Sequence, residues 1–113
     1  MLDERGAVVC ARCALATNTF RRMKGLLGRR SLDDDEGLLI RPTSSIHTWF
    51  MRFPIDVVFL DRELHVVRVA EDVRAWRAVH AKGARVVLEL PAGAAARAGL
   101  HAGAQLALSG PTD

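Results

Sequence analysis

The chain has 113 residues, half of them apolar and only 5% aromatic, and its formal net charge is +3. This length is enough for one hydrophobic core and too short for two. The apolar content and the small net charge exclude intrinsic disorder as the main state. No apolar run approaches the roughly 18 residues that cross a bilayer. We therefore expect a single globular domain over residues 1–113 with no membrane segment.

The start of the chain is the first feature that bears on location. Met1 is followed within four residues by two acids, and the short apolar stretch after them is interrupted by Arg12. A secretory signal peptide has a basic start and a longer apolar segment. The sequence therefore predicts a cytoplasmic protein.

Fourteen of the sixteen basic residues are arginines, which suggests recognition of phosphate or carboxylate groups. The arginines are spread along the chain among acids, however, whereas a nucleic-acid interface needs basic residues clustered on one face with exposed aromatics. The pattern disfavours nucleic acid as a partner, and a weak basic nucleic-acid binder stays as an alternative.

The two cysteines, Cys10 and Cys13, form an isolated CxxC pair. A zinc site needs two further ligands at suitable spacing, and the four histidines are too scattered to supply them. A redox pair needs its first cysteine at a helix N-terminus, where the thiolate is stabilised. The spacing therefore favours two reduced structural thiols, and we expect no metal and no cofactor.

Residues 17–29 are predicted to form a short helix, in which Phe20, Met23 and Leu27 recur at helical spacing. Arg22 and Arg29 lie seven residues apart and therefore share one helix face, with a glycine between them. Two guanidinium groups on such a face could hold an anion. An acidic turn at residues 33–36 follows, and it lacks the later residues of a calcium loop.

From residue 37 onward the pattern changes to that of strands. Residues 71–84 are mixed and give no clear prediction. A helical turn is expected over Ala94–Ala98, closed by Gly99, with Leu100 packing back beneath it. The predicted strands are Leu38–Arg41, Ile46–Met51, Ile55–Asp61, Leu64–Ala70, Val86–Leu90 and Ala104–Leu108.

Five or six short strands with two small helices and no regular alternation predict an α+β domain. We expect a compact, β-rich, barrel-like single domain with one helix in its N-terminal half and a short helical turn near the C-terminus. In Val86–Leu90 the apolar side chains alternate with Arg85 and Glu89, which predicts a half-buried strand.

Several of these segments together resemble the domain-of-unknown-function 192 family. The resemblance covers about residues 15–108 and implies a small β-rich domain, with no activity to carry over. This sequence departs from the family pattern at two positions. The turn after Asp61 lacks a glycine that is often present there, and Ala104 stands where an aspartate is common. The residues that carry the resemblance are Thr19, Arg22, Gly25–Arg29, Gly37–Ile40, Ile46–Asp61, Leu88–Gly93 and Gly99–Gly103.

Asp56 is the first candidate for chemistry, because it stands between Ile55 and the apolar run Val57–Leu60. A buried carboxylate is costly unless donors or a cation meet it. One interpretation makes Asp56 a pocket-wall anion or general base, with His47 as its proton-transfer partner and Arg22 or Arg29 as a charge partner. The other gives it a structural role, accepting backbone N–H bonds after Pro54 or pairing with an arginine.

His47, Trp49 and Met51 share one predicted strand face and could line a ligand pocket or belong to the core. Our leading hypothesis is a module that binds a small anionic ligand or a protein partner. Its cleft would lie between the Arg22/Arg29 helix and the His47–Asp56 segment. The alternative is a hydrolytic or acid–base enzyme that uses His47 and Asp56. The binding candidates are Arg22, Arg29, His47, Trp49 and Asp56.

Overall fold

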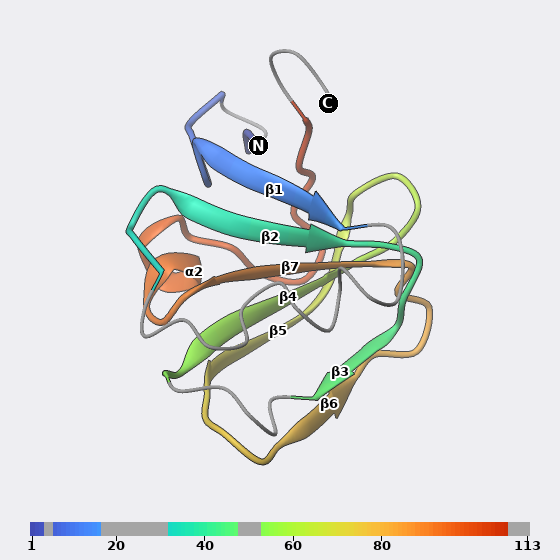
Figure 1. Ribbon diagram of the computed structural model, residues 1–113. Helices are drawn as coiled ribbons and strands as arrows, with labels where there is room; N and C mark the ends of the chain where they lie inside the picture. The colour runs from blue at the N-terminus through green and yellow to red at the C-terminus, as the bar shows by residue number, and fades with distance from the viewer. Residues whose placement is uncertain (4–5, 17–31, 48–52, 109–113) are drawn as a thin grey trace.

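The computed structural model describes residues 1–3, 6–16, 32–47 and 53–108. Strands dominate this part of the chain, and its single helix is short (Figure 1). The helix predicted over residues 17–29 and the end of the predicted strand Ile46–Met51 lie outside the described residues. The elements are β1 (Arg12–Ala16), β2 (Glu36–Ile40), β3 (Ser45–His47), β4 (Ile55–Leu60), β5 (Val66–Val73), β6 (Ala78–His80), β7 (Val86–Pro91) and α2 (Ala94–Arg97).

Five of the strands form one sheet in the order β1-β2-β7-β4-β5. The β1 and β2 strands are parallel, and the other neighbours are antiparallel. β3 and β6 pair separately as a second, two-stranded sheet, which lies beyond β5 in Figure 1. The β-rich α+β class is confirmed. Among the described strands β1 and β5 lie at the two ends of the sheet and do not pair with each other, so the sheet does not close into the barrel that we expected.

The central strands β4 and β7 are buried along their whole length. For β4 the sequence predicts this, because Ile55–Leu60 is apolar on both faces, as expected of a strand covered on both sides. For β7 the half-buried prediction is wrong. Because β7 lies between β2 and β4 and both sheet faces are covered, Glu89 is enclosed together with its apolar neighbours.

Two hydrophobic clusters cover the two faces of the five-stranded sheet. Val58, Leu60 and Leu88 point to the first cluster, which the N-terminal residues, α2 and Leu106 complete. Val57, Phe59 and Val87 point to the second. Ile46 of β3 and Val79 of β6 pack against that second cluster, so the small sheet covers this face.

Near the C-terminus the predicted helical turn is confirmed as α2, and Gly99 adopts the positive φ of 68° that ends it. Leu100 packs against the first cluster as expected. The strand expected over Ala104–Leu108 is wrong. There the chain forms only isolated bridges, Gln105 with His65 and Ala107 with Leu2, so it follows the sheet without joining its ladder.

The cysteine pair differs from expectation as well, because Cys10 and Cys13 are joined in a disulfide with 6.0 Å between their Cα atoms. Cys10 is buried in the first cluster. The pair lies directly over Gly37 of β2, where a methyl group in place of the hydrogen would approach both sulfur atoms and Leu90 within 3.0–3.3 Å. The packing where β1 pairs with β2 therefore leaves no room for a side chain at Gly37.

We expect Gly37→Ala to lower the free energy of unfolding by about 1–3 kcal/mol, the usual cost of overpacking a filled site. Chemical denaturation measures this loss. Repeating the change in a Cys10→Ala/Cys13→Ala background gives a double-mutant cycle, in which removal of the sulfurs should recover much of the loss. An equal loss in both backgrounds would show that the sulfur contact is not the cause.

Candidate functional site

The structure describes two of the five predicted site residues, His47 and Asp56. Arg22, Arg29 and Trp49 lie outside the described residues. The backbone of His47 ends β3 and pairs with Ala78 of β6. Asp56 is the second residue of β4, opposite Leu90 of β7.

The Asp56 side chain is completely buried, with 0% of its surface exposed. Its carboxylate accepts three backbone hydrogen bonds. Oδ1 accepts from the Asp72 N–H at 2.9 Å. Oδ2 accepts from the Gly93 N–H at 3.0 Å and from the Ala95 N–H at 2.9 Å. The donors come from the end of β5 and the start of α2, so one side chain joins three segments that are far apart in the sequence.

These hydrogen bonds favour the structural interpretation of Asp56, with donors other than those predicted. The donors lie 16 to 39 residues away rather than in the turn after Pro54. Two of the three donor residues, Asp72 and Gly93, have positive φ angles of 50° and 90°, so the carboxylate stabilises bends of unusual backbone conformation. A carboxylate with both oxygens occupied and no exposed surface is poorly placed to take a proton from a ligand.

Glu89 of β7 is a buried acid that sequence reasoning placed on an exposed strand face. Only 7% of its surface is exposed. The register places it beside Leu38 of β2 and Val57 of β4, and Val57 in turn pairs with Ala70 of β5. Glu89 therefore lies on the sheet face of the second hydrophobic cluster.

Within the part of the chain that the structure describes, no hydrogen bond or ion pair reaches the Glu89 carboxyl. Burial raises the pKa of this group from its ordinary 4.5 to about 7, because the ionised form loses its hydration. The signal in the sequence was available: Glu89 stands between Leu88 and Leu90, as Asp56 stands between Ile55 and Val57. What the sequence did not show is that β7 is a central strand.

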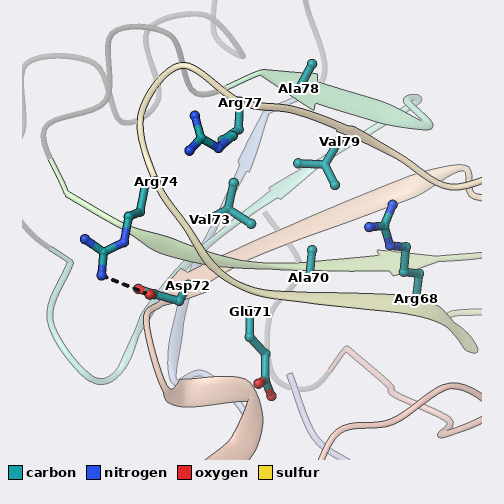
Figure 2. Close-up of a pocket in the computed structure, with 9 residues that line it drawn as sticks. All are labelled: Arg68, Ala70, Glu71, Asp72, Val73, Arg74, Arg77, Ala78 and Val79. Carbon is teal, nitrogen blue, oxygen red and sulfur yellow. Dashed lines mark hydrogen bonds and ion pairs between the residues drawn. The ribbon is translucent and has the colours of Figure 1, made fainter.

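A hollow of about 460 Å³ opens between β5 and the turn that leads to β6 (Figure 2). Arg68, Arg74 and Arg77 line it, together with Glu71 and Asp72. Its apolar lining includes Ala70, Val73 and Val79. The sequence left residues 71–84 without a prediction, so this collection of charges was missed.

Two of these arginines are held by neighbours. Arg68 donates a 2.7 Å hydrogen bond to the His80 carbonyl oxygen, and its guanidinium lies 6.0 Å from the centre of the Phe59 ring. Arg74 forms an ion pair with Asp72 at 3.3 Å, drawn as a dashed line in Figure 2. The side chains of Arg68 and Arg74 are therefore held in place in the charged wall of the hollow.

One group of described residues has metal-ligand chemistry, namely Asp61, Glu63 and His65 in the turn between β4 and β5. Asp61 Oδ1 accepts the backbone N–H groups of His65 and Glu63, each at 2.9 Å, and these bonds contribute to a pKa of Asp61 below its ordinary value, with the His65 N–H the largest cause. Asp61 Oδ2 lies 3.3 Å from His65 Nδ1. These contacts account for the cluster as the closure of a turn that lacks glycine.

The fold and the buried acids of the described residues define a small protein built on a mostly antiparallel β-sheet. The family model DUF192, described as "Uncharacterized ACR", matches residues 1–108. The chain belongs to this family, as the resemblance in the sequence predicted.

Known relatives agree with this assignment. A UPF0127 protein of Thermococcus sibiricus is 33% identical over 94 residues, which cover 79% of this chain and 60% of the relative. The chain thus spans less than two thirds of that relative's length.

Two solved structures share the fold. A protein of unknown function from Novosphingobium aromaticivorans is 27% identical, with a TM-score of 0.75 over 82% of this chain and 71% of its own. A protein named as a candidate transcription regulator, from Sinorhizobium meliloti, is 23% identical, with a TM-score of 0.75 over 82% of this chain and 78% of its own. At this identity the second likeness concerns the fold alone. In the described residues, no helix has the length and apolar character needed to cross a membrane.

We expect Asp56→Asn to lower the free energy of unfolding by about 3 kcal/mol, because the amide that replaces one oxygen cannot accept the buried N–H bonds. The substitution is nearly isosteric, so cavity formation does not contribute. Urea denaturation measures the loss, and Asp34→Asn in the exposed acidic turn is the matched control. A change below about 0.5 kcal/mol, the usual size for a surface site, would contradict the role assigned to Asp56.

Glu89 should make stability depend on pH. Since its folded pKa of about 7 is above the ordinary 4.5, the folded state keeps the proton that the unfolded state releases. The contribution of Glu89 to the free energy of unfolding is therefore fully present below pH 4.5 and is lost as the pH rises to about 7. The difference corresponds to about 3 kcal/mol.

Glu89→Gln removes this titration. We expect the free energy of unfolding of the variant, relative to the unmodified protein, to rise by about 3 kcal/mol between pH 4.5 and pH 8. Denaturation curves at several pH values measure this difference. The exposed Glu63→Gln is the control and should run parallel to the unmodified protein. If both variants give the same curve, Glu89 is not the buried acid described here.

Proposed function

We propose that the protein is a small-ligand-binding module and that Glu89 makes a polar contact with the ligand. The observation that carries this proposal is a carboxyl group that is almost fully buried on a central strand, with no hydrogen bond or ion pair from the described part of the chain. Arg22, Arg29, His47 and Trp49 remain part of the proposal as the residues inferred from the sequence. Glu89 replaces Asp56 as the carboxyl that contacts the ligand.

The free-energy cost of burying the Glu89 carboxyl group supports a role for this residue in binding. An apolar residue in its place would fill the second hydrophobic cluster without lowering stability above neutral pH. Residues that reduce stability in this way are concentrated at binding and catalytic sites, where a shifted pKa and an unsatisfied polar group serve the ligand. A ligand that hydrogen-bonds Glu89 would supply a partner that none of the described residues supplies.

The pKa of about 7 also predicts how the charge of the ligand matters. A protonated Glu89 donates a hydrogen bond to an anion such as a carboxylate, whereas the ionised form repels it. The small anionic ligand predicted from the sequence should therefore bind more tightly below pH 7 than above it. A ligand with an amine should show the opposite dependence.

Ligand-observed NMR with a set of small carboxylates, phosphates and amines, at pH 6 and pH 8, tests the proposal. We expect an anionic compound to bind the unmodified protein about tenfold more weakly at pH 8, since one charge repulsion of about 1.4 kcal/mol has this effect. Glu89→Gln, which stays neutral, should bind it equally at both values, and Glu89→Leu should bind it at neither.

Glu63→Gln on the surface is the matched control and should behave as the unmodified protein does. Binding that Glu89→Leu leaves intact would place the ligand elsewhere and refute the proposal. If only compounds with an amine bind, the ligand is cationic rather than anionic, and Glu89 is still the residue that contacts it.

An acid–base enzyme is the second candidate, and the same pKa favours it, because a general acid or base works best when its pKa is near the working pH. In this version Glu89 replaces Asp56 as the carboxyl that acts with His47. The NMR spectra of bound compounds separate the two candidates. Signals of a reaction product that grow with time would establish the enzyme, and unchanged spectra of a bound compound favour the binding module.

The cytoplasmic location inferred from the sequence belongs to this proposal too. In that compartment cellular reductants would keep Cys10 and Cys13 as two thiols, whereas the disulfide is the form expected in an oxidising compartment.

A further inference from the structure

We propose that Cys10 and Cys13 are a redox-active pair that exchanges electrons with a dithiol, and that Cys13 is the sulfur which the dithiol attacks. The turn at residues 33–35 holds the two cysteines near each other when their bond is open. This activity does not depend on the function proposed for Glu89. The disulfide packs beside Leu90 in the first hydrophobic cluster, and Leu90 and Glu89 are adjacent in β7 and face opposite sides of the sheet.

The two sulfur atoms differ in their access to solvent. Cys10 has only 1% of its surface exposed and belongs to the first hydrophobic cluster. Cys13 is partly buried and packs against that cluster from outside it. Exchange at an existing disulfide needs access to one of its sulfur atoms, and no helix N-terminus is required for it. An incoming thiolate therefore meets Cys13, and Cys10 is the sulfur that leaves.

The exchange is a two-electron reduction of the disulfide in two steps. A thiolate of the dithiol attacks the Cys13 sulfur, the bond between Cys10 and Cys13 breaks, and the departing Cys10 thiolate takes up a proton. The second thiolate of the dithiol then attacks the dithiol's own sulfur in the mixed disulfide, and Cys13 leaves as a thiolate and takes up a proton. The cysteine pair gains two electrons and two protons, which the dithiol loses as it becomes a disulfide.

The chain between the cysteines is held in place by contacts that involve no sulfur. The backbone N–H groups of Ala11 and Arg12 donate to the Asp35 carbonyl oxygen at 3.0 and 2.8 Å. The Arg12 guanidinium forms ion pairs with Asp33 at 3.0 Å and with Asp35 at 2.8 Å. These contacts keep the bend when the bond is open, so the two thiols stay at a high effective concentration and the disulfide re-forms readily.

The disulfide is also one that the fold does not need. A disulfide stabilises mainly by limiting the unfolded chain, and this effect grows with the number of residues that it encloses. The present bond joins residues only three positions apart, so its effect is small. A neutral Cys10 thiol packs in an apolar cluster as a small hydrophobic group does. We therefore expect the protein to stay folded in both redox states, as a reversible pair requires.

Treatment of the unmodified protein with dithiothreitol in the absence of denaturant tests this inference, with alkylation and mass spectrometry to count the thiols. We expect complete reduction with an unchanged circular dichroism spectrum, and complete re-formation of the disulfide with oxidised glutathione.

The sulfur that is attacked can be identified directly. Brief treatment of the oxidised protein with reduced glutathione, stopped by acid and followed by alkylation, should leave glutathione on Cys13. Trypsin cleaves after Arg12 and so separates the two cysteines into different peptides. As a matched pair of variants, Cys10→Ala should react with oxidised glutathione about tenfold faster than Cys13→Ala, because its remaining thiol is the accessible one.

The role of the turn is tested by Arg12→Gln, which removes the ion pairs with Asp33 and Asp35. We expect the disulfide of this variant to re-form about fivefold more slowly, the effect of losing one well-formed exposed ion pair. Arg62→Gln, at an exposed arginine outside this turn, is the matched control and should re-form its disulfide as the unmodified protein does.

Three results would each overturn the proposal. The first is a disulfide that dithiothreitol reduces only in denaturant. The second is glutathione on Cys10 rather than on Cys13. The third is a disulfide that re-forms as fast in Arg12→Gln as in Arg62→Gln.

Discussion

The arrangement of this protein depends on the buried carboxylate of Asp56. A charge inside a hydrophobic sheet is tolerated only when donors surround it, and here three backbone N–H groups do so. Because those donors belong to the end of β5 and to the start of α2, the same side chain connects a central strand, an edge strand and the helix. A displacement of β5 or α2 away from β4 would leave the buried carboxylate or one of these buried N–H groups unsatisfied.

The two buried acids show opposite uses of the same chemical group. Asp56 has its hydrogen bonds from the protein itself, so its burial stabilises the fold. Glu89 lies one position further along the neighbouring strand, since Asp56 pairs with Leu90 and Val57 pairs with Glu89. Adjacent residues of one strand face opposite sides of the sheet, so the two carboxyls are directed to different faces. One face thus has a satisfied acid and a packed helix, and the other has an acid whose burial raises its pKa and lowers stability.

The turn that connects β5 with β6 begins at the bend that Asp56 holds through its hydrogen bond from the Asp72 N–H. Asp72 has a positive φ and donates to Asp56, and the turn after it carries Arg74, Trp76 and Arg77. Positions of this kind combine a fixed base with exposed, chemically diverse side chains, which is the usual basis of recognition by loops.

The sequence was informative where the local pattern alone decides the outcome. The apolar run Ile55–Leu60 identified a strand buried on both faces, and Gly99 followed by Leu100 identified the end of α2. The cost of a charge in that run identified Asp56 as a residue that must have partners. The strand β1, the disulfide and the β6 strand were missed, because their formation depends on neighbours that are distant in the chain.

What the sequence by itself determined is the α+β class, the family and the position of one buried carboxylate. Only the tertiary structure decided which groups meet that carboxylate, that Glu89 is enclosed, and that three arginines line one hollow. The physical reason is strand order. The alternation of residues along β7 is the same for an edge strand and a central strand, and only its place between β2 and β4 turns Glu89 from a solvated side chain into a buried acid.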